Sequence, residues 1–370
     1  MRIGLTYDLQ HDPHDERQAE FDPPRTLEAL CQALSGLGHQ VVRLGAAQEL
    51  LAATDRLSAV ELVFNLAEGS RGRCREAWVP MLLEVLKVPY VGSDALALSV
   101  GLDKVACKRL AVAHGIPTPP WTVITHPDRL PAQIPVRFPA IVKPRYEGSG
   151  IGIDEGAIVS NRTELAQRAR WLFARWPEEM LIEEMVPHGE LTVCVIGNDP
   201  PTETALSSLS RECRDAVAAR PTAYPAIQRP LDPRSRLSCH VARAATGPWE
   251  TPLVLNESLE AQARRIALTL FEALGCADVA RVDLRVDEQG KVWFLEINPL
   301  PSFDPEGSFG LLAEHAGLSY PQIIDRILQA AIRRLRLREP ASATRWSPPG
   351  IRLCCRGRHR AEAGAPCGGG

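Results

Sequence analysis

Three oxygen-bearing side chains and one arginine occupy alternate positions in two apolar runs in the last third of the chain. They are Arg281, Asp283, Glu296 and Asn298. The runs 281–286 and 291–298 flank a polar turn, 287–290, that ends in glycine, and this pattern predicts a β-hairpin. Because alternate side chains of a strand point to one side, we expect the four to share a face. Hard oxygen ligands on a rigid sheet suit Mg²⁺, which keeps several waters and is completed by phosphates.

The register of this hairpin decides whether the four side chains meet. A symmetric four-residue turn places Arg281 opposite Glu296 and Asp283 opposite Phe294. The other face then carries Val282, Leu284, Trp293, Leu295 and Ile297. A bulge shifts the register by one residue and separates the set. Without a ligand the same pattern is a solvated strand face with cross-strand ion pairs, so both interpretations stay open.

A second candidate site is the glycine-rich segment that follows the apolar run 139–143. Gly148, Gly150 and Gly152 stand at every second position, and Lys143 precedes them. Glycine at this spacing lets backbone amides approach an anion closely, and a lysine at a strand end is a ready phosphate partner. The segment has neither the Walker sequence nor the dinucleotide fingerprint. It therefore predicts either a phosphate-binding loop or a flexible surface turn.

Length and composition limit the class of protein. A chain of 370 residues predicts two or three domains, and a net charge of −3 argues against a nucleic-acid partner. The N-terminus does not resemble a signal peptide and no apolar run spans a membrane, so we expect a cytoplasmic protein. The ten cysteines include no Cys-x-x-Cys pair, which predicts reduced thiols. Residues 338–370 are rich in Arg, Pro and Gly without periodicity, which predicts a disordered tail.

Strands and helices alternate over the first hundred residues, which predicts βαβ units and a parallel sheet. We expect strands at 2–7, 41–44 and 59–65, and helices at 26–37, 47–54 and 75–86. Ligands of such sheets bind at the carboxyl ends of strands, so Asp8 and the loop 65–73 should face a crevice.

The rest of the chain predicts α+β structure. We expect strands at 121–125, 139–143, 180–186 and 191–196, and helices at 103–114, 162–175, 259–274, 309–316 and 320–336. From 200 to 256 the pattern is irregular; 204–209 reads as a strand, and the proline-rich stretch 221–233 as a loop. A long irregular segment of this kind predicts a lid or a disordered insertion.

In order and spacing, these motifs resemble the ATP-grasp superfamily, and within it the D-alanine–D-alanine ligases. The likeness covers about residues 60–335. It is densest in Tyr90–Ser93, Asp103-Lys104, Gly115–Pro117, Val142–Pro144, Glu147–Ser149 and the hairpin. The resemblance implies an ATP-grasp fold with an N-terminal α/β domain at 1–100. Two α+β subdomains, 101–186 and 187–337, would then clasp ATP between antiparallel sheets.

The resemblance also implies a mechanism. A carboxylate attacks the γ-phosphate to give an acyl phosphate and ADP, and an amine then displaces phosphate. By match to the family, Asp283, Glu296 and Asn298 would hold two Mg²⁺ ions, or Mn²⁺ in their place. The nucleotide contacts would be Lys104, Lys143, Gly148, Gly150, Gly152, Glu183, Glu184, Val186 and Glu190. Arg281 would stabilise the acyl phosphate, and Ser149 and Ser302 would contact the amino-acid substrates.

The half of the site that would hold amino acids departs from the family. The ligases open with a Gly-Gly-Ser/Thr-x-Glu loop whose glutamate holds the first ammonium, whereas here the first strand runs into Tyr7–His11. Asp8 or Glu68 would have to replace that glutamate. The lid segment 211–229 contains arginines and no lysine, and Ser302 stands where the family has glycine.

We therefore expect a ligase for a carboxylate and an amine other than two D-alanines, with a homodimer compatible with the sequence. An ATP-dependent phosphotransferase that transfers to a hydroxyl, and a nucleotide-binding protein without turnover, are the alternatives.

Overall fold

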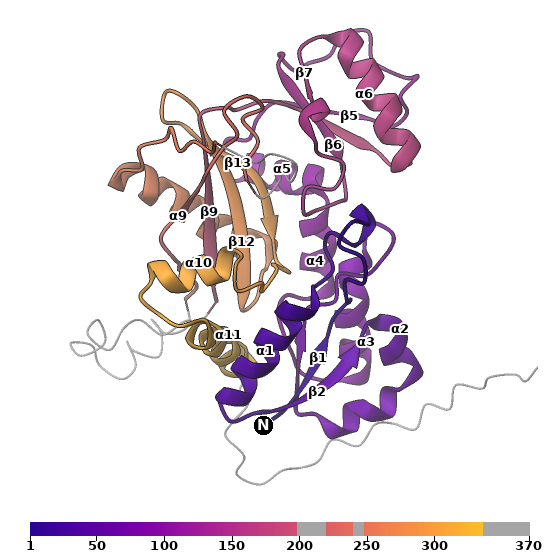
Figure 1. Ribbon diagram of the computed structural model, residues 1–370, viewed down its shortest axis with the longest axis vertical. Coiled ribbons are helices and arrows are strands. Elements are labelled where there is room, and N and C mark those ends of the chain that lie inside the picture. Colours follow the sequence, from indigo (N-terminus) through magenta and orange to yellow (C-terminus); the bar gives the residue numbers. More distant parts are fainter. Residues whose placement is uncertain (198–219, 240–247, 336–370) are drawn as a thin grey trace, which may run out of the picture.

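The computed structural model describes residues 1–197, 220–239 and 248–335. Figure 1 shows an N-terminal domain at the bottom, in indigo and violet, with two further sheets above it. The predicted tail 338–370 and the possible strand 204–209 lie outside the described ranges. No helix within those ranges is long and apolar enough to span a bilayer.

The N-terminal domain is built on a parallel sheet, as the sequence predicts. The sheet has the order β2-β1-β3-β4, and its fourth strand was not predicted. Its strands are β1 (Arg2–Thr6), β2 (Gln40–Gly45), β3 (Leu62–Asn65) and β4 (Tyr90–Val91). Its helices are α1 (Pro24–Gly36), α2 (Ala47–Ala52), α3 (Trp78–Leu86) and α4 (Ala95–Leu102), with the 3-10 helices η1 (Glu16–Gln18), η2 (Thr54–Ala59) and η3 (Arg75–Ala77). The third strand begins three residues later than predicted because η2 occupies the preceding segment.

The sequence pattern does not reveal helix α4. Apolar residues surround it on all sides, so it lacks the stripe of 3.6-residue period that marks an amphipathic helix. Asp94 caps its N-terminus by accepting a hydrogen bond from the Ala97 N–H at 2.8 Å. Helix α5 (Lys104–Ala113) follows directly, and both helices contact the last strand of the C-terminal sheet.

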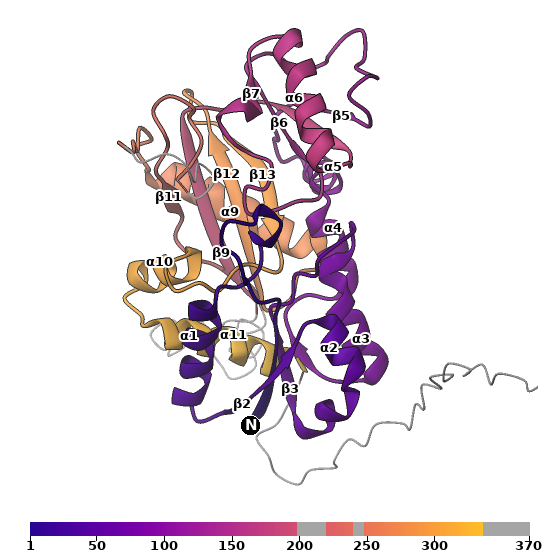
Figure 2. The same cartoon turned by 45° about the vertical axis from the view of Figure 1, so that its right-hand side comes forward.

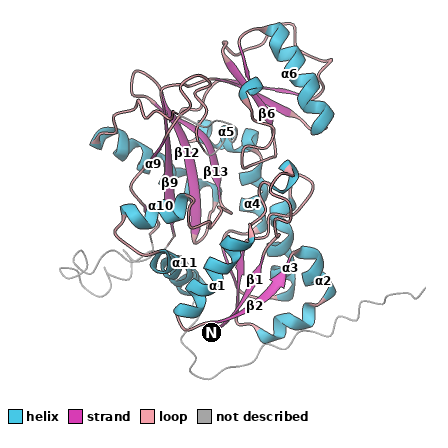
Figure 3. Cartoon of the chain, viewed as in Figure 1, coloured by secondary structure: helices cyan, strands magenta, loops and turns pink. Residues whose placement is uncertain are grey.

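The second part of the molecule is an antiparallel sheet of order β5-β8-β6-β7. Its strands are β5 (Trp121–Ile124), β6 (Ala140–Pro144), β7 (Ile158–Val159) and β8 (Met180–Glu184), with the 3-10 helix η4 (Glu155–Ala157) before β7. Helix α6 (Arg162–Arg175) packs on β6 and β7 (Figure 3). It begins at Asn161, whose side chain accepts hydrogen bonds from the next two backbone N–H groups.

The third part is an antiparallel sheet of order β10-β9-β12-β13, in which β11 also pairs with β9. Its strands are β9 (Gly189–Ile196), β10 (Thr222–Ala223), β11 (Ile227–Arg229), β12 (Val279–Val286) and β13 (Val292–Asn298). Helices α9 (Glu257–Leu274), α10 (Ser308–His315) and α11 (Tyr320–Leu335) pack against it (Figure 2). The predicted loop at 221–233 therefore contains two short strands, which are too brief between prolines to show a period of two.

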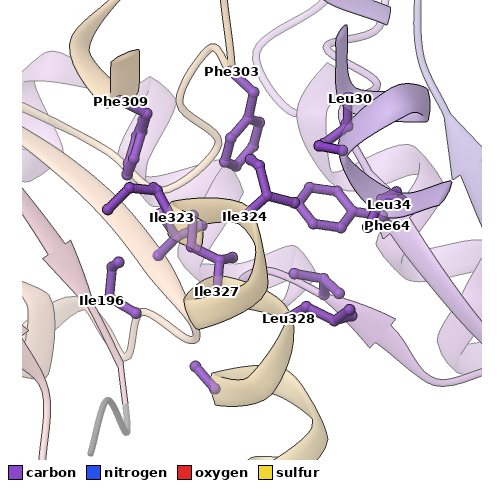
Figure 4. Close-up of a cluster of buried hydrophobic side chains, with 14 of the residues drawn as sticks. Leu30, Leu34, Phe64, Ile196, Phe303, Phe309, Ile323, Ile324, Ile327 and Leu328 are labelled. Carbon is purple, nitrogen blue, oxygen red and sulfur yellow. The ribbon is translucent and has the colours of Figure 1, made fainter. Parts of the chain in front are cut away.

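Helix α11 joins the N-terminal domain to the C-terminal sheet. Figure 4 shows its apolar face inserted between side chains of the two parts. The cluster includes Leu30, Leu34, Phe64, Ile196, Phe303, Ile323, Ile324, Ile327 and Leu328. An ion pair links the same two parts: Arg334 contacts the buried carboxylate of Asp278 at 2.7 Å, and the Gly92 N–H donates to that carboxylate at 2.9 Å. The two parts are thus held together by packing and by charge.

Candidate active site

The hairpin of β12 and β13 has a different register from the predicted one. Its turn contains five residues, 287–291, so that Leu284 pairs with Phe294. A bulge at Leu295 then shifts the pairing by one, and Asp283 lies opposite Glu296. The predicted pairs of Arg281 with Glu296 and of Asp283 with Phe294 are therefore wrong.

The four polar side chains still share one face, because the two departures offset each other. The longer turn shifts the register by one residue and the bulge shifts it by one more, and a shift of two preserves the face. The longer turn pairs Phe294 with Leu284 and so places Phe294 in the core with Val282 and Ile297. Trp293 and Leu295 were predicted on that apolar face, but both are only half-buried and lie outside the core. Leu295 lines a pocket described below.

The side chain of Asp287 accounts for the longer turn. Its Oδ1 accepts hydrogen bonds from the N–H groups of Gln289 and Lys291, at 3.0 and 2.9 Å. Its Oδ2 accepts from the indole N–H of Trp293 at 2.8 Å. An aspartate that binds nearby backbone N–H groups stabilises turns of this kind.

Asp283 is the most constrained member of the set. It is 3 % exposed and accepts hydrogen bonds from Thr192 Oγ1 at 2.8 Å and from Arg281 Nε at 3.0 Å. Asn298 Nδ2 donates to it at 3.3 Å. Burial alone would lower the pKa of Arg281, but the charges of Asp283 and Glu296 outweigh burial and raise it. The arginine is therefore a permanent cation at the edge of the site.

Glu296 is differently placed, because its carboxylate makes no hydrogen bond or ion pair with any residue in the described ranges. It lines two adjacent pockets. Asp283 lines the first of these pockets with it, and Asn298 lines the second. Two carboxylates and an amide are donors that fit Mg²⁺. No group of three His, Cys, Asp or Glu side chains suited to a metal occurs in the described part of the chain. A cation here would need water or phosphate oxygens as further ligands, as Mg²⁺ commonly has.

The first pocket, called here the inter-sheet pocket, lies between the two antiparallel sheets. It is lined by all the predicted nucleotide contacts except Gly152, namely Lys104, Lys143, Gly148, Gly150, Glu183, Glu184, Val186 and Glu190. The predicted catalytic residues Ser149 and Arg281 and the predicted metal ligands Asp283 and Glu296 line it as well. Gly152, Asn298 and Ser302 do not line it.

Two lysines and one glutamate form a buried charge cluster at this pocket, which Lys143 and Glu183 line and Lys108 does not. Glu183 binds Lys143 at 2.5 Å and Lys108 at 2.6 Å. Burial raises the pKa of Glu183, but the two lysines outweigh it and lower that pKa to about 2. Lys108 is not among the site residues predicted from the sequence. The sequence does contain a sign of its role: Lys108 follows Lys104 by four residues in one helix, and residues at this spacing lie on the same face of the helix.

Three other predicted nucleotide contacts bind neighbouring protein groups. Lys104 Nζ donates to the backbone oxygen of Glu147. Glu190 binds Arg285 at 3.0 Å. Glu184 binds the exposed Arg137 at 2.8 Å.

The glycine loop donates two of its backbone N–H groups to carboxylates of the N-terminal domain. The Gly148 N–H donates to Glu20 at 2.7 Å, and the Gly152 N–H donates to Glu16 at 2.7 Å. A Cβ atom at Gly148 would lie 2.5 Å from the Glu20 carboxylate, so any other residue here would displace that carboxylate. Ser149 has a φ of 47°, in the left-handed region. Neither glutamate was singled out from the sequence, where both lie in a long polar loop after β1.

The second pocket adjoins the first and is called here the acid pocket. It is lined by Glu20, Glu68, Glu76, Lys104, Ser149, Arg281, Glu296, Asn298 and Ser302, among others. Of the two acids considered as substitutes for the family's glutamate, Glu68 lines this pocket. Asp8 does not, and its carboxylate accepts a hydrogen bond from the Gly69 N–H at 2.8 Å.

The chain is similar to known proteins over most of its length. The family model described as D-ala D-ala ligase C-terminus matches residues 110–215 and 243–329. The D-alanine–D-alanine ligase of Syntrophotalea carbinolica is 31 % identical over 309 residues, which cover 83 % of this chain and 90 % of that protein. An uncharacterized protein of Sinorhizobium fredii is 29 % identical over 329 residues, which cover 87 % and 92 % of the two chains.

A solved structure shares the fold. The crystal structure of D-alanine–D-alanine ligase from Bacillus anthracis complexed with ATP superposes with a TM-score of 0.67. The match covers 92 % of this chain and 99 % of the other, at 22 % sequence identity. The predicted three-part ATP-grasp fold is thereby confirmed.

Proposed function

This chain belongs to the D-alanine–D-alanine ligase family and is an ATP-dependent carboxylate–amine ligase, and we propose that it joins a carboxylate and an amine other than two D-alanines. The proposed route runs through an acyl phosphate. One observation carries the proposal: Lys104, Ser149, Arg281 and Glu296 line both the inter-sheet pocket and the acid pocket. A γ-phosphate in the first and a substrate carboxylate in the second would meet beside these side chains.

The charges of the inter-sheet pocket support binding of ATP. Lys104 and Lys143 are buried cations that suit the α- and β-phosphates, and the amides of Gly148 and Gly150 suit the γ-phosphate. The planar guanidinium of Arg281 suits the oxygens of an acyl phosphate and of the tetrahedral intermediate.

Asp283, Glu296 and Asn298 would hold Mg²⁺, which when bound neutralises charge on the phosphates. Glu190 is assigned to the ribose and the backbone near Val186 to adenine, while Ser149 and Ser302 are assigned to the amino-acid substrates. Ser302 lines the acid pocket only, which supports a role with the substrate.

The N-terminal loop supports substrates that differ from D-alanine. Where the family has a Gly-Gly-Ser/Thr-x-Glu loop, the segment 7–22 of this chain lacks that motif and brings Glu16 and Glu20 to the glycine loop.

The cysteines bear on where the protein works. The six cysteines in the described ranges are free, which supports a reducing, cytoplasmic location.

Phosphate release from ATP in mixtures of amino acids and dipeptides tests the proposal. We expect release that requires a carboxylate and an amine together. Glu296→Gln should reduce turnover by about 10³-fold, since removing several kcal/mol of stabilisation costs a factor of ten per 1.4 kcal/mol. Glu288→Gln, an exposed residue of the same hairpin, is the control and should leave turnover unchanged. Transfer to a hydroxyl alone would identify a phosphotransferase instead, and nucleotide binding without release would contradict any ligase.

A further inference from the structure

The acid pocket contains more carboxylates than the surrounding cations can neutralise. Arg75 binds Glu20 at 2.6 Å and Glu147 at 3.3 Å. Arg281, which lines the pocket, binds Asp283 of the hairpin. Lys104, the other cation that lines the pocket, donates to the backbone oxygen of Glu147. The charges of Arg75 and Lys104 still act on Glu76, but neither cation forms a hydrogen bond or an ion pair with Glu68 or Glu76 within the described ranges.

Glu68 and Glu76 line the acid pocket without a partner. Neither carboxylate makes a hydrogen bond or an ion pair with another residue within 1–197, 220–239 or 248–335. Glu76 belongs to the short η3 helix and is 7 % exposed, so water cannot solvate it fully. A buried carboxylate without a partner is costly, and proteins rarely keep one unless a ligand or a cation completes it.

The two carboxylates lie close enough to repel each other. Burial, followed by the charge of Glu20, raises the pKa of Glu76 to about 8. Burial, followed by the charge of Glu76, raises the pKa of Glu68 well above its usual value. A cation that binds beside them would relieve both effects, because burial and like charge are the causes of the shift.

One ammonium group does not account for both acids. An ordinary α-amino acid brings one ammonium, which can pair with one of these carboxylates and leaves the other unpaired. We propose, on the basis of the ligase function above, that the amino-acid substrate of the acid pocket is a diamino acid, with one ammonium bound at Glu76 and the other at Glu68. Its carboxylate then points to Arg281 and Ser149, where the two pockets meet.

Binding to the full-length protein with Mg²⁺ and a non-hydrolysable ATP analogue tests this proposal. Matched pairs that differ by one amine are titrated in both chiralities by calorimetry: 2,3-diaminopropionate against alanine, ornithine against norvaline, and lysine against norleucine. We expect at least one diamino acid to bind about tenfold or more tightly than its neutral partner, a difference of about 1.4 kcal/mol. Equal binding in all three pairs, or no binding by any diamino acid, overturns the proposal.

Substitutions assign the preference to the two acids. Glu76→Gln and Glu68→Gln should each remove most of the preference, while Glu288→Gln keeps it. Binding of the ATP analogue shows that each variant is folded, because neither Glu76 nor Glu68 lines the inter-sheet pocket. A preference that survives both substitutions contradicts the assignment.

The same experiments separate this inference from the ligase function. Turnover with neutral amino acids and no preference for diamino acids would refute the inference and leave the ligase. A clear preference without phosphate release in any mixture of a carboxylate and an amine would refute the ligase and leave the cation site.

Discussion

At the scale of single residues, Glu183 shows how one carboxylate organises the inter-sheet pocket. It is 2 % exposed and lies between two buried lysines, Lys108 and Lys143. Burying three charges together is tolerated because each ammonium faces the same carboxylate. The sequence predicts Lys143 at this site from its position at a strand end, whereas nothing in the sequence shows that Glu183 turns toward it instead of toward a ligand.

Replacing Glu183 with Gln leaves two buried ammonium groups without a carboxylate. We expect the free energy of unfolding to fall by about 3–5 kcal/mol, the usual cost of breaking a buried pair from one side. Glu184→Gln is the control on the same strand; its partner Arg137 is 86 % exposed, so the loss should stay below about 1 kcal/mol. Urea denaturation of both variants measures the difference. Equal losses would show that the cluster contributes no more than a surface pair.

The same cluster predicts that the stability of the folded protein falls at acidic pH. The folded pKa of Glu183 is about 2, below its ordinary value of 4.5. The folded state therefore binds fewer protons, and the contribution of Glu183 is present above pH 4.5 and lost as the pH falls toward 2. Wild-type protein should lose stability faster than Glu183→Gln across this window. Parallel curves in denaturation at several pH values would contradict this.

At the scale of elements, the hairpin explains which part of the site is predictable. The sequence shows that Arg281 and Asp283 share one face of their strand, and that Glu296 and Asn298 share one face of theirs, because residues two positions apart in a strand point to the same side. The pairing between the strands depends on the turn and the bulge. Those follow from the hydrogen bonds of Asp287 and from the packing of Phe294, neither of which a local pattern contains.

Two neighbouring aromatic residues test the bulge. Phe294 is fully buried in the core, and Phe294→Ala should lower the free energy of unfolding by about 3–5 kcal/mol. Trp293 is half-buried on the other face, and Trp293→Ala should cost clearly less. A symmetric hairpin without a bulge would give the reverse order, because it places Trp293 in the core. Urea denaturation of the two variants, side by side, distinguishes the registers.

At the scale of the whole molecule, the chain's last described helix holds distant parts together. Helix α11 packs on α1 and carries Arg334 to Asp278, which precedes β12. The sequence predicts the helix from its period. It does not predict its neighbours, since contacts such as Ile324 with the N-terminal domain join residues that are hundreds of positions apart. The order of strands and helices can thus be predicted from the sequence, whereas the way in which the three parts pack together cannot.

Asp278→Asn tests this connection. Asp278 has a φ of 63°, a conformation that asparagine also tolerates, so the substitution removes the charge without backbone strain. We expect the free energy of unfolding to fall by about 3 kcal/mol, the lower end for a buried pair, because Arg334 is 30 % exposed. Asp325→Asn, on the half-buried side of α11, is the control and should change it little. An equal effect of both would mean that the ion pair does not join the two parts.

The contact between the glycine loop and Glu16 and Glu20 has a consequence for the order of events. A backbone N–H donates at full strength to one acceptor at a time, so an anion that takes the Gly148 or Gly152 donor displaces a glutamate. Of the two glycines only Gly148 lines the inter-sheet pocket, so arrival of a triphosphate there would transfer the Gly148 N–H from Glu20 to a phosphate oxygen. Arg75 would keep Glu20 in place, and nucleotide binding would reach the segment between β1 and α1 through this one exchanged hydrogen bond.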